Sequence, residues 1–187
     1  LFFMGWLYNF SGLKEVCKKL LSSNNKDIKI MIVGEGDAYN ELNDISKGVA
    51  SIILTGKKPY DEIPSLIAAS DLCMLPAYRD EEIMQDIVPI KMYEYMAMEK
   101  PVIATRLPGV MKEFGEDNGI IYVDRPEDVI EEALRLVNGN TLEELGLKGR
   151  RFAERNSWDK ITDEFERILN EAVKEKKDGR MPERVQG

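Results

Sequence analysis

Histidine is absent from the 187-residue sequence, and cysteine occurs only twice. Histidine is the commonest general base and metal ligand of proteins, so catalysis by this chain would depend on carboxylates, lysines or backbone dipoles. The two cysteines, Cys17 and Cys73, fall in a helical pattern and in an apolar run, with no partners for a metal site or a nucleophile. We therefore expect two reduced core thiols and no metal site.

Long apolar runs are also missing, since none approaches the roughly 20 residues of a membrane-spanning helix. The apolar start, LFFMGWLYNF, has neither the basic residues nor the cleavage site of a signal peptide. The formal net charge of −8 disfavours binding of nucleic acid by the whole surface, so we expect no nucleic-acid partner. These features predict a cytoplasmic protein. Peripheral association with the inner face of the membrane, through the basic stretch KEKKDGR, is an alternative.

Short apolar stretches alternate with helical patterns along the chain. IKIMIVGEG is a continuous apolar run, typical of a strand buried on both faces, and Leu13, Val16, Leu20 and Leu21 repeat on one face of the preceding helix. Six such strands predict an α/β fold: a Rossmann-like, doubly wound parallel six-stranded sheet with helices on both faces, in three α/β/α layers. Ligands of such sheets bind beyond the carboxyl ends of the strands.

The domain is expected to span residues 1–175, and a mobile polar tail to follow over 176–187. Because the chain opens directly on a strand, we expect it to be a fragment of a longer protein. Trp158 opens the last predicted helix, and we expect its ring to pack against the domain. The methionines between Met92 and Met98 are expected to fill the core.

Glycine follows several of the predicted strands. Gly5, after the first, would let the backbone approach a ligand, although glycine there is equally typical of a plain turn. The stretch GEGDAY begins like a dinucleotide fingerprint, but Tyr39 stands where the third glycine should fall. A nicotinamide-dependent dehydrogenase is therefore disfavoured.

The stretch DIVPIKMYEYMAMEKPVIAT, residues 86–105, predicts an anion site. Proline is favoured at the first helical position, so a helix is expected to start at Pro89. The N–H groups of Ile90 and Lys91 would then point out of the helix N-terminus, where the dipole favours an anion. Glu94 lies about one turn on and could accept hydrogen bonds from paired hydroxyls. A phosphate with a sugar behind it suits this geometry, and an ordinary amphipathic helix with both charges solvated is equally compatible with it.

Six motifs occur in one order along residues 1–172. They are GWLYNFSGLKEV, KIMIVGEG, ILTGKKPYDEIPSLIAASDLCMLP, VPIKMYEYMAMEKPVIATRLPG, GIIYV and NSWDKITDEFERIL. In this order they resemble the C-terminal domain of the retaining GT-B glycosyltransferases, the glycosyl transferases group 1 family. EYMAMEKPVIAT is similar to the family signature EAMAxGxPVIAT, with Glu99 in the glycine position.

The resemblance implies the donor-binding half of an enzyme that transfers a sugar, with retention of anomeric configuration, from a UDP-, GDP- or ADP-sugar. The acceptor would be a saccharide, a lipid or a small molecule, bound by an N-terminal domain that this chain lacks. We expect the isolated half to be inactive. The nucleotide sugar is a substrate, and no cofactor is expected.

The resemblance also implies the roles of the charged residues. Two acids separated by seven residues flank the donor in this family. Asp86, one methylene shorter than the usual glutamate, would touch the transferred sugar, and Glu94 would hold the ribose. Asp86, Lys91 and Glu94 are therefore the residues expected at the reaction, which would proceed by electrostatic stabilisation of the leaving diphosphate.

The segment Pro89, Ile90 and Lys91 matches the backbone that binds the diphosphate in this family. A proline replaces the usual glycine there, so one amide donor is lost and Lys91 would compensate for it. Lys57 and Lys58 match the loop that lines the nucleotide base. The residues expected to bind the donor are Gly5, Lys57, Lys58, Arg79, Pro89, Ile90, Lys91 and Glu94.

One departure from the family pattern affects the phosphate site. Trp6 and Ser11 stand where the family commonly has an arginine and a lysine that neutralise the diphosphate, and Arg79, Arg106 or Lys91 could replace them. Two alternatives follow from this departure and from the fold. The chain could be a non-catalytic module that binds or senses a nucleotide sugar, or part of a GT-B-fold sugar-nucleotide epimerase.

Overall fold

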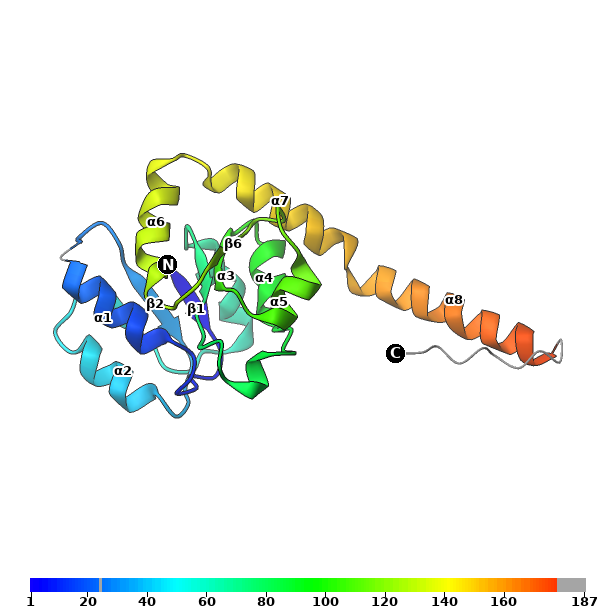
Figure 1. The fold of residues 1–187 in the computed structure, drawn as a ribbon, viewed down its shortest axis with the longest axis horizontal. Helices are drawn as coiled ribbons and strands as arrows, with labels where there is room; N and C mark the ends of the chain where they lie inside the picture. Colours follow the sequence, from blue (N-terminus) through cyan, green and yellow to red (C-terminus); the bar gives the residue numbers. More distant parts are fainter. Residues whose placement is uncertain (24, 178–187) are drawn as a thin grey trace.

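The computed structural model describes residues 1–23 and 25–177 of the chain, and these residues form one six-stranded sheet covered by helices (Figure 1). The strands are β1 (Phe2–Met4), β2 (Ile30–Val33), β3 (Ile52–Leu54), β4 (Cys73–Leu75), β5 (Val102–Thr105) and β6 (Ile120–Val123). The helices are α1 (Leu13–Ser23), α2 (Tyr39–Ser46), α3 (Ile63–Ala68), α4 (Ile90–Ala97), α5 (Pro108–Phe114), α6 (Asp128–Asn138), α7 (Leu142–Arg155) and α8 (Trp158–Lys177), with short 3₁₀ helices η1 (Tyr60–Glu62) and η2 (Glu82–Met84).

The strand order is β3-β2-β1-β4-β5-β6, and every neighbouring pair is parallel. The register pairs Phe3 with Ile32 and Ile103 with Ile121. From β1 the chain builds the sheet first toward β3 and then, after returning to β4, toward β6. The order therefore reverses between β1 and β4, and an α/β sheet offers its ligand crevice at the carboxyl ends of such a pair. The predicted Rossmann-like, three-layer fold is confirmed.

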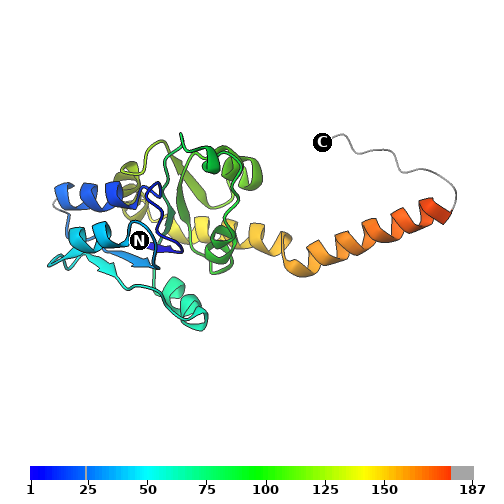
Figure 2. The same cartoon turned by 90° about the horizontal axis from the view of Figure 1, so that it is seen from below.

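The apolar side chains form two clusters, one on each face of the sheet. On one face, α1, α2 and α6 pack residues such as Leu13, Leu42 and Ile130 against the sheet. On the other, α3, α4, α5 and α7 contribute side chains such as Ile67 and Phe114. Figures 1 and 2 show these two layers of helices with the sheet between them. Both clusters include strand residues, because the central strands are buried on both faces, as the apolar runs predict.

The helix α1 shows both a confirmed prediction and a wrong one. Leu13, Val16, Cys17 and Leu20 are buried as expected, but the side chain of Leu21 is 42% exposed. Successive residues of an α-helix are rotated by about 100° around its axis, so Leu21 lies on the solvent side although its neighbour Leu20 faces the core. Cys17 is a free buried thiol, as predicted, and burial raises its pKa to about 12.

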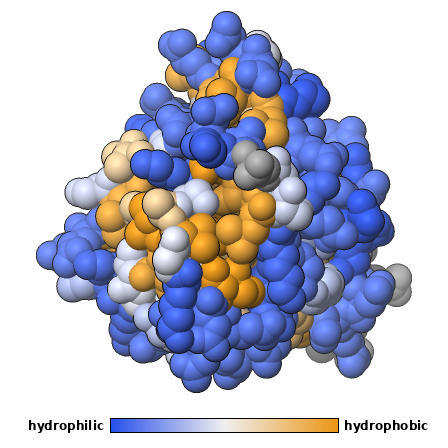
Figure 3. Space-filling model, turned by 90° about the vertical axis from the view of Figure 1, so that its left-hand side faces the viewer, coloured by the Kyte–Doolittle hydropathy of each residue, from blue (hydrophilic) through white to orange (hydrophobic). Residues whose placement is uncertain are grey.

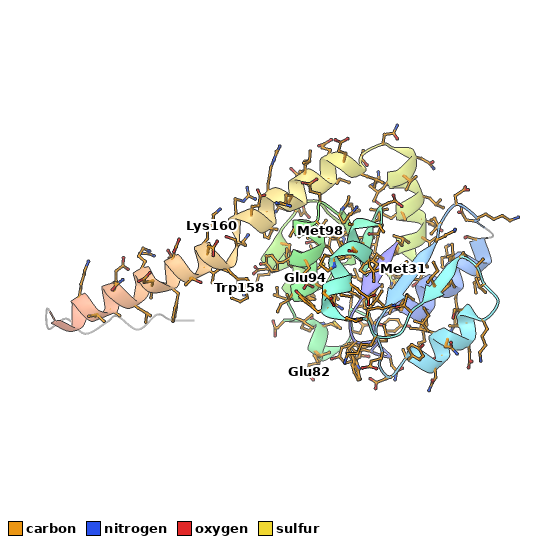
Figure 4. All side chains as sticks on the ribbon, turned by 180° about the vertical axis from the view of Figure 1, so that it is seen from behind. Met31, Glu82, Glu94, Met98, Trp158 and Lys160 are labelled. Carbon is orange, nitrogen blue, oxygen red and sulfur yellow. The ribbon has the colours of Figure 1, made fainter. Side chains whose placement is uncertain are left out.

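The last helix, α8, projects from the domain in both views (Figures 1 and 2). The prediction that Trp158 packs against the domain is wrong for the described residues, since its side chain is 78% exposed at the start of this helix (Figure 4). The other large apolar side chains of α8 are also exposed: Ile161, Phe165, Ile168, Leu169 and Val173. The described residues provide nothing that covers these side chains.

Two further features concern the ends and the surface of the molecule. Lys176 and Lys177 of the predicted tail belong to α8, and residues 178–187 lie outside the described residues.

Among the helices that the structure describes, none is both long and apolar enough to cross a membrane. The side of the molecule shown in Figure 3 is mainly hydrophilic, with an apolar area near its centre.

Candidate functional site

A pocket of about 660 Å³ opens at the carboxyl ends of the strands on the β1 side of the switch point. It is lined by the ends of β1 and β2, by the segment that runs from the loop after β3 through η1 to the start of α3, and by the start of α4 with the residues that lead into it. The residues that line it include Gly5, Trp6, Glu35, Lys57, Lys58, Tyr60, Pro89, Ile90, Lys91 and Glu94. Seven of the eight residues predicted to bind the donor thus meet at one place, and Arg79 is the exception.

Glycines bring the strand ends close enough to form the floor of this pocket. The N–H of Gly5 donates to the carbonyl of Val33 (3.0 Å), and the N–H of Gly34 donates to that of Gly56 (2.9 Å). Gly34 has φ of +144°, and a Cβ atom there would collide with the carbonyl oxygen of Gly5. Only glycine allows both this conformation and this approach, so the sequence dictates the shape of the floor.

The helix α4 points its N-terminus at the pocket. It begins at Ile90, one residue later than predicted, because Pro89 has the extended conformation (φ −72°, ψ 122°) and serves as the N-cap. The N–H of Met92 donates to the carbonyl of Pro89 (3.0 Å), which leaves the N–H groups of Ile90 and Lys91 at the open end of the helix. Free N–H groups and the helix dipole both favour an anion here.

Lys91 is the cation at the floor of the pocket. Its Nζ atom lies 4.3 Å from the centre of the Phe3 ring, and a Cβ atom on Gly5 would come within 2.5 Å of it. Burial lowers the pKa of Lys91 to about 8, and the carboxylate of Glu94 opposes this effect only in part. None of the ion pairs among residues 1–23 and 25–177 involves Lys91. A desolvated cation without a counter-ion favours binding of an anion.

Glu94 lies one turn further along α4 and on the same side as Lys91. Its Oε1 atom accepts a hydrogen bond of 2.9 Å from the phenol of Tyr60, which stands in η1. This hydrogen bond raises the pKa of Tyr60. Tyr60 is a site residue that the sequence reasoning missed, although it follows the predicted base-binding lysines by only two positions.

Lys57 and Lys58 lie at the mouth of the pocket, in the loop after β3. Each is near one acid: Lys57 Nζ is 3.6 Å from Glu35 Oε1, and Lys58 Nζ is 3.6 Å from Glu62 Oε2. These exposed pairs contribute little to stability. Because the acids offset part of the positive charge at the mouth, Lys91 carries the strongest attraction for an anion.

Asp86 and Arg79 lie outside the pocket lining. Asp86 is exposed, and its backbone rests on α5, where a Cβ atom on Gly109 would come within 2.7 Å of the Asp86 carbonyl carbon. Arg79 lines a second hollow beyond β4–β6, where its Nη1 is 3.8 Å from Asp124 Oδ1. Arg106 approaches the same oxygen, at 3.5 Å through Nε. Of the three candidate replacements for the missing phosphate cations, only Lys91 therefore lines the pocket.

Trp6 and Ser11, which replace the basic pair of the family pattern, have different surroundings. Trp6 lines the pocket and is 48% exposed. Ser11 is buried, and its N–H donates to the carbonyl of Tyr8 (3.1 Å) in the turn before α1. An apolar ring thus stands at the pocket where the pattern has a cation.

Solved structures similar to this one are GT-B glycosyltransferases. HepE of Anabaena, solved in complex with UDP, aligns with a TM-score of 0.74 and 16% identity over 91% of this chain and 48% of its own. A glycosyltransferase from Rickettsia africae aligns with a TM-score of 0.71 and 19% identity over 92% of this chain and 48% of its own. At these identities the likeness shows the fold.

Curated relatives are similar in sequence. A glycosyltransferase of Methanocaldococcus jannaschii, described as uncharacterized, is 29% identical over 150 residues, which are 78% of this chain and 41% of that protein. An alpha-D-kanosaminyltransferase of Streptomyces kanamyceticus is 26% identical over 129 residues, 66% of this chain and 32% of that protein. The chain spans less than half the length of these relatives. The model of the glycosyl transferases group 1 family matches residues 1–139, and the chain belongs to this family.

Proposed function

We propose that this chain is the donor-binding part of a glycosyltransferase, which binds a nucleotide sugar at the carboxyl ends of its strands. The observation that carries the proposal is the combination, in one pocket, of the open N-terminus of α4 with Lys91, a partly buried cation that forms no ion pair within the described residues. A diphosphate supplies the negative charge that both of them favour. HepE, which shares the fold, has been solved with UDP and with UDP-glucose.

The remaining lining residues suit the other parts of a nucleotide sugar. A ribose one turn along α4 could donate its two hydroxyls to the carboxylate of Glu94. The base would then lie toward the mouth of the pocket, beside Lys57 and Lys58, and the sugar would extend past Val88 toward Asp86. UDP-, GDP- and ADP-sugars all share the diphosphate and ribose on which this assignment rests.

The proposed chemistry is electrostatic. When the bond between the anomeric carbon and the diphosphate breaks, negative charge grows on the leaving oxygen beside Lys91 and the N–H groups of Ile90 and Lys91. Preorganised cations and dipoles stabilise such charge without reorganising during the reaction. Asp86 would orient the sugar, and the acceptor would attack with retention of configuration. No cofactor is required by this scheme.

The acceptor would bind to the rest of a longer protein, because the chain spans less than half the length of its relatives. A saccharide, a lipid or a small molecule would each suit a transferase of this kind. We place the protein in the cytoplasm, where Cys17 and Cys73, both buried and unpaired, would stay reduced. Contact with the inner face of the membrane through its C-terminal basic stretch is compatible with this placement.

Binding of UDP, GDP and ADP to the 187-residue chain, measured by calorimetry, tests the proposal. The tightest of the three should lose about 1–3 kcal/mol of binding free energy in Glu94→Ala, the range for hydrogen bonds to a charged group. Glu113→Ala is a matched control, because Glu113 also accepts a hydrogen bond from a tyrosine, Tyr93, but lies outside the pocket. An unchanged affinity in a folded Glu94→Ala variant would contradict the ribose assignment, and no binding of any of the three would refute the donor site.

Transfer is the second readout. The isolated chain should not transfer a sugar, because the acceptor-binding part lies outside it, whereas the full-length protein should do so from one of the nucleotide sugars. A full-length protein that binds a donor but neither transfers nor hydrolyses it would identify a non-catalytic module. Conversion of the donor sugar without an acceptor, detected by NMR, would identify an epimerase.

A further inference from the structure

Tyr60 is an exposed aromatic side chain at the edge of the pocket. It is 76% exposed, stands at the start of η1 and lies near Lys57 and Lys58, where the base is proposed to bind. Tyr60 belongs to neither of the two hydrophobic clusters. The packing of the core therefore does not fix the position of its ring.

One polar contact holds the phenol in place. Its Oη atom donates to Oε1 of Glu94 at 2.9 Å, which joins the loop after β3 to α4 across the pocket. The backbone beneath it is short and ordered, since the N–H of Glu62 donates to the carbonyl of Pro59 (3.1 Å). Rotation of the Tyr60 side chain alone would therefore release Glu94, without a change in the fold of the loop.

The same contact occupies an atom that a ribose would use. A carboxylate has two oxygens, and a cis-diol binds it best through both. Within the described residues, Glu94 has one of these oxygens, Oε1, already bound to Tyr60. The phenol of Tyr60 therefore competes with a ribose that binds Glu94 through both hydroxyls, because it takes up one acceptor site of Oε1 on the side of the pocket.

We propose that Tyr60 is a latch: its hydroxyl competes with the ribose of the incoming nucleotide for Glu94. When the ribose displaces this hydroxyl, the ring of Tyr60 is free to cover the nucleoside. This inference rests on the proposed function, since it names the residue that sets the affinity of the same site for its nucleotide. The hydroxyl of Tyr60 opposes binding and the ring favours it. The two effects can therefore be separated by removing the hydroxyl alone.

Tyr60→Phe is the test, with UDP, GDP and ADP as probes and the one that binds most tightly used throughout. The variant should bind it about two- to fivefold more tightly, as expected for loss of one exposed hydrogen bond that competes at a charged group. The matched control is Tyr93→Phe, which removes a phenol bonded to Glu113 outside the pocket and should leave the affinity unchanged. Thermal unfolding checks that both variants fold.

Two further comparisons give the latch its own signature. In a Glu94→Ala background, Tyr60→Phe should no longer change the affinity, because the phenol then has no carboxylate to occupy. With the 2′-deoxy form of the same nucleotide, which can use one oxygen of Glu94 while the phenol keeps the other, the gain from Tyr60→Phe should be smaller than with the ribonucleotide.

The sign of the effect decides between the latch and its rivals. A weaker affinity in Tyr60→Phe would show that the phenol positions Glu94 for the ribose, and an unchanged affinity would show that it does neither. Either result overturns the latch while the proposed function stands, provided that Glu94→Ala still weakens binding. If none of the three nucleotides binds the wild-type chain, the proposed function fails and the latch fails with it.

Discussion

The partly buried charge of Lys91 should make nucleotide binding depend on pH in a way that identifies this residue. Burial lowers its pKa from the ordinary 10.5 to about 8. A diphosphate next to Nζ favours the protonated amine and raises its pKa again. Below about pH 8 the amine is charged with or without the nucleotide, so pH has little effect through this group. As pH rises from about 8 toward 10.5, binding must take up a proton and the affinity falls.

The size of the effect follows from the same pKa. At pH 8 about half of the free chains carry the Lys91 proton, whereas nearly all of the complexes carry it, so binding should take up about half a proton. At higher pH the uptake approaches one proton, and the affinity then falls by as much as about tenfold per pH unit until the amine of the complex itself loses its proton.

Calorimetry at pH 8 in two buffers of different ionisation enthalpy measures this uptake directly. The terminal phosphate of a nucleoside diphosphate, with a second pKa near 6, is fully ionised at this pH and does not contribute. Lys91→Met, close to lysine in length, should abolish the uptake and weaken binding by about 1.5–3 kcal/mol, the value of a charge-assisted hydrogen bond. Lys57→Met removes an exposed charge from the mouth of the same pocket and should keep the uptake. Equal uptake in wild type and Lys91→Met would refute the assignment of Lys91 to the diphosphate.

Two predictions concern the scaffold of the site. Gly109→Ala would place a Cβ atom 2.8 Å from the carbonyl oxygen of Ile87, so it should displace the segment that leads into α4, cost about 1–3 kcal/mol in denaturant unfolding and lower nucleotide affinity in the same preparation. Native stability and affinity together would contradict this packing. Phe114→Ala should cost about 3–5 kcal/mol of unfolding free energy, because the ring is fully buried against Tyr93 and Phe152. Phe165→Ala, at an exposed position of α8, should cost about 0.5 kcal/mol or less, and equal losses in the two variants would show that the core is misassigned.

The strands and most helices could be predicted because each carries a strong local pattern. Runs such as IMIV are apolar at every position only when both faces of a strand are buried, and Gly139 ends α6 at its C-cap as a helix stop predicts. Errors arose where a neighbour decides the outcome. The exposure of Trp158 could not be read from α8 itself, because an amphipathic pattern predicts an apolar face but not what covers it.

The candidate site was predictable in part for the same reason. Lys91 and Glu94 share a face of one helix whose start a proline marks, so their grouping follows from local spacing. Arg79 depends on the path of a long loop and ends up beside Asp124 instead. Tyr60 has no periodic pattern around it, and its bond to Glu94 joins residues 34 positions apart. Contacts between residues so far apart in the sequence are set by the tertiary fold and not by a local pattern.

The two tryptophans of the chain stand at two different exposed surfaces. Trp6 is 48% exposed at the pocket beside α4, and Trp158 is 78% exposed where α8 leaves the domain. Indole emission shifts with the polarity around the ring, so each tryptophan is an intrinsic optical probe of its own surface. Replacing Trp158 leaves Trp6 to follow occupancy of the pocket, and replacing Trp6 leaves Trp158 to follow whatever covers α8. The chain can therefore be titrated at either surface without an attached dye.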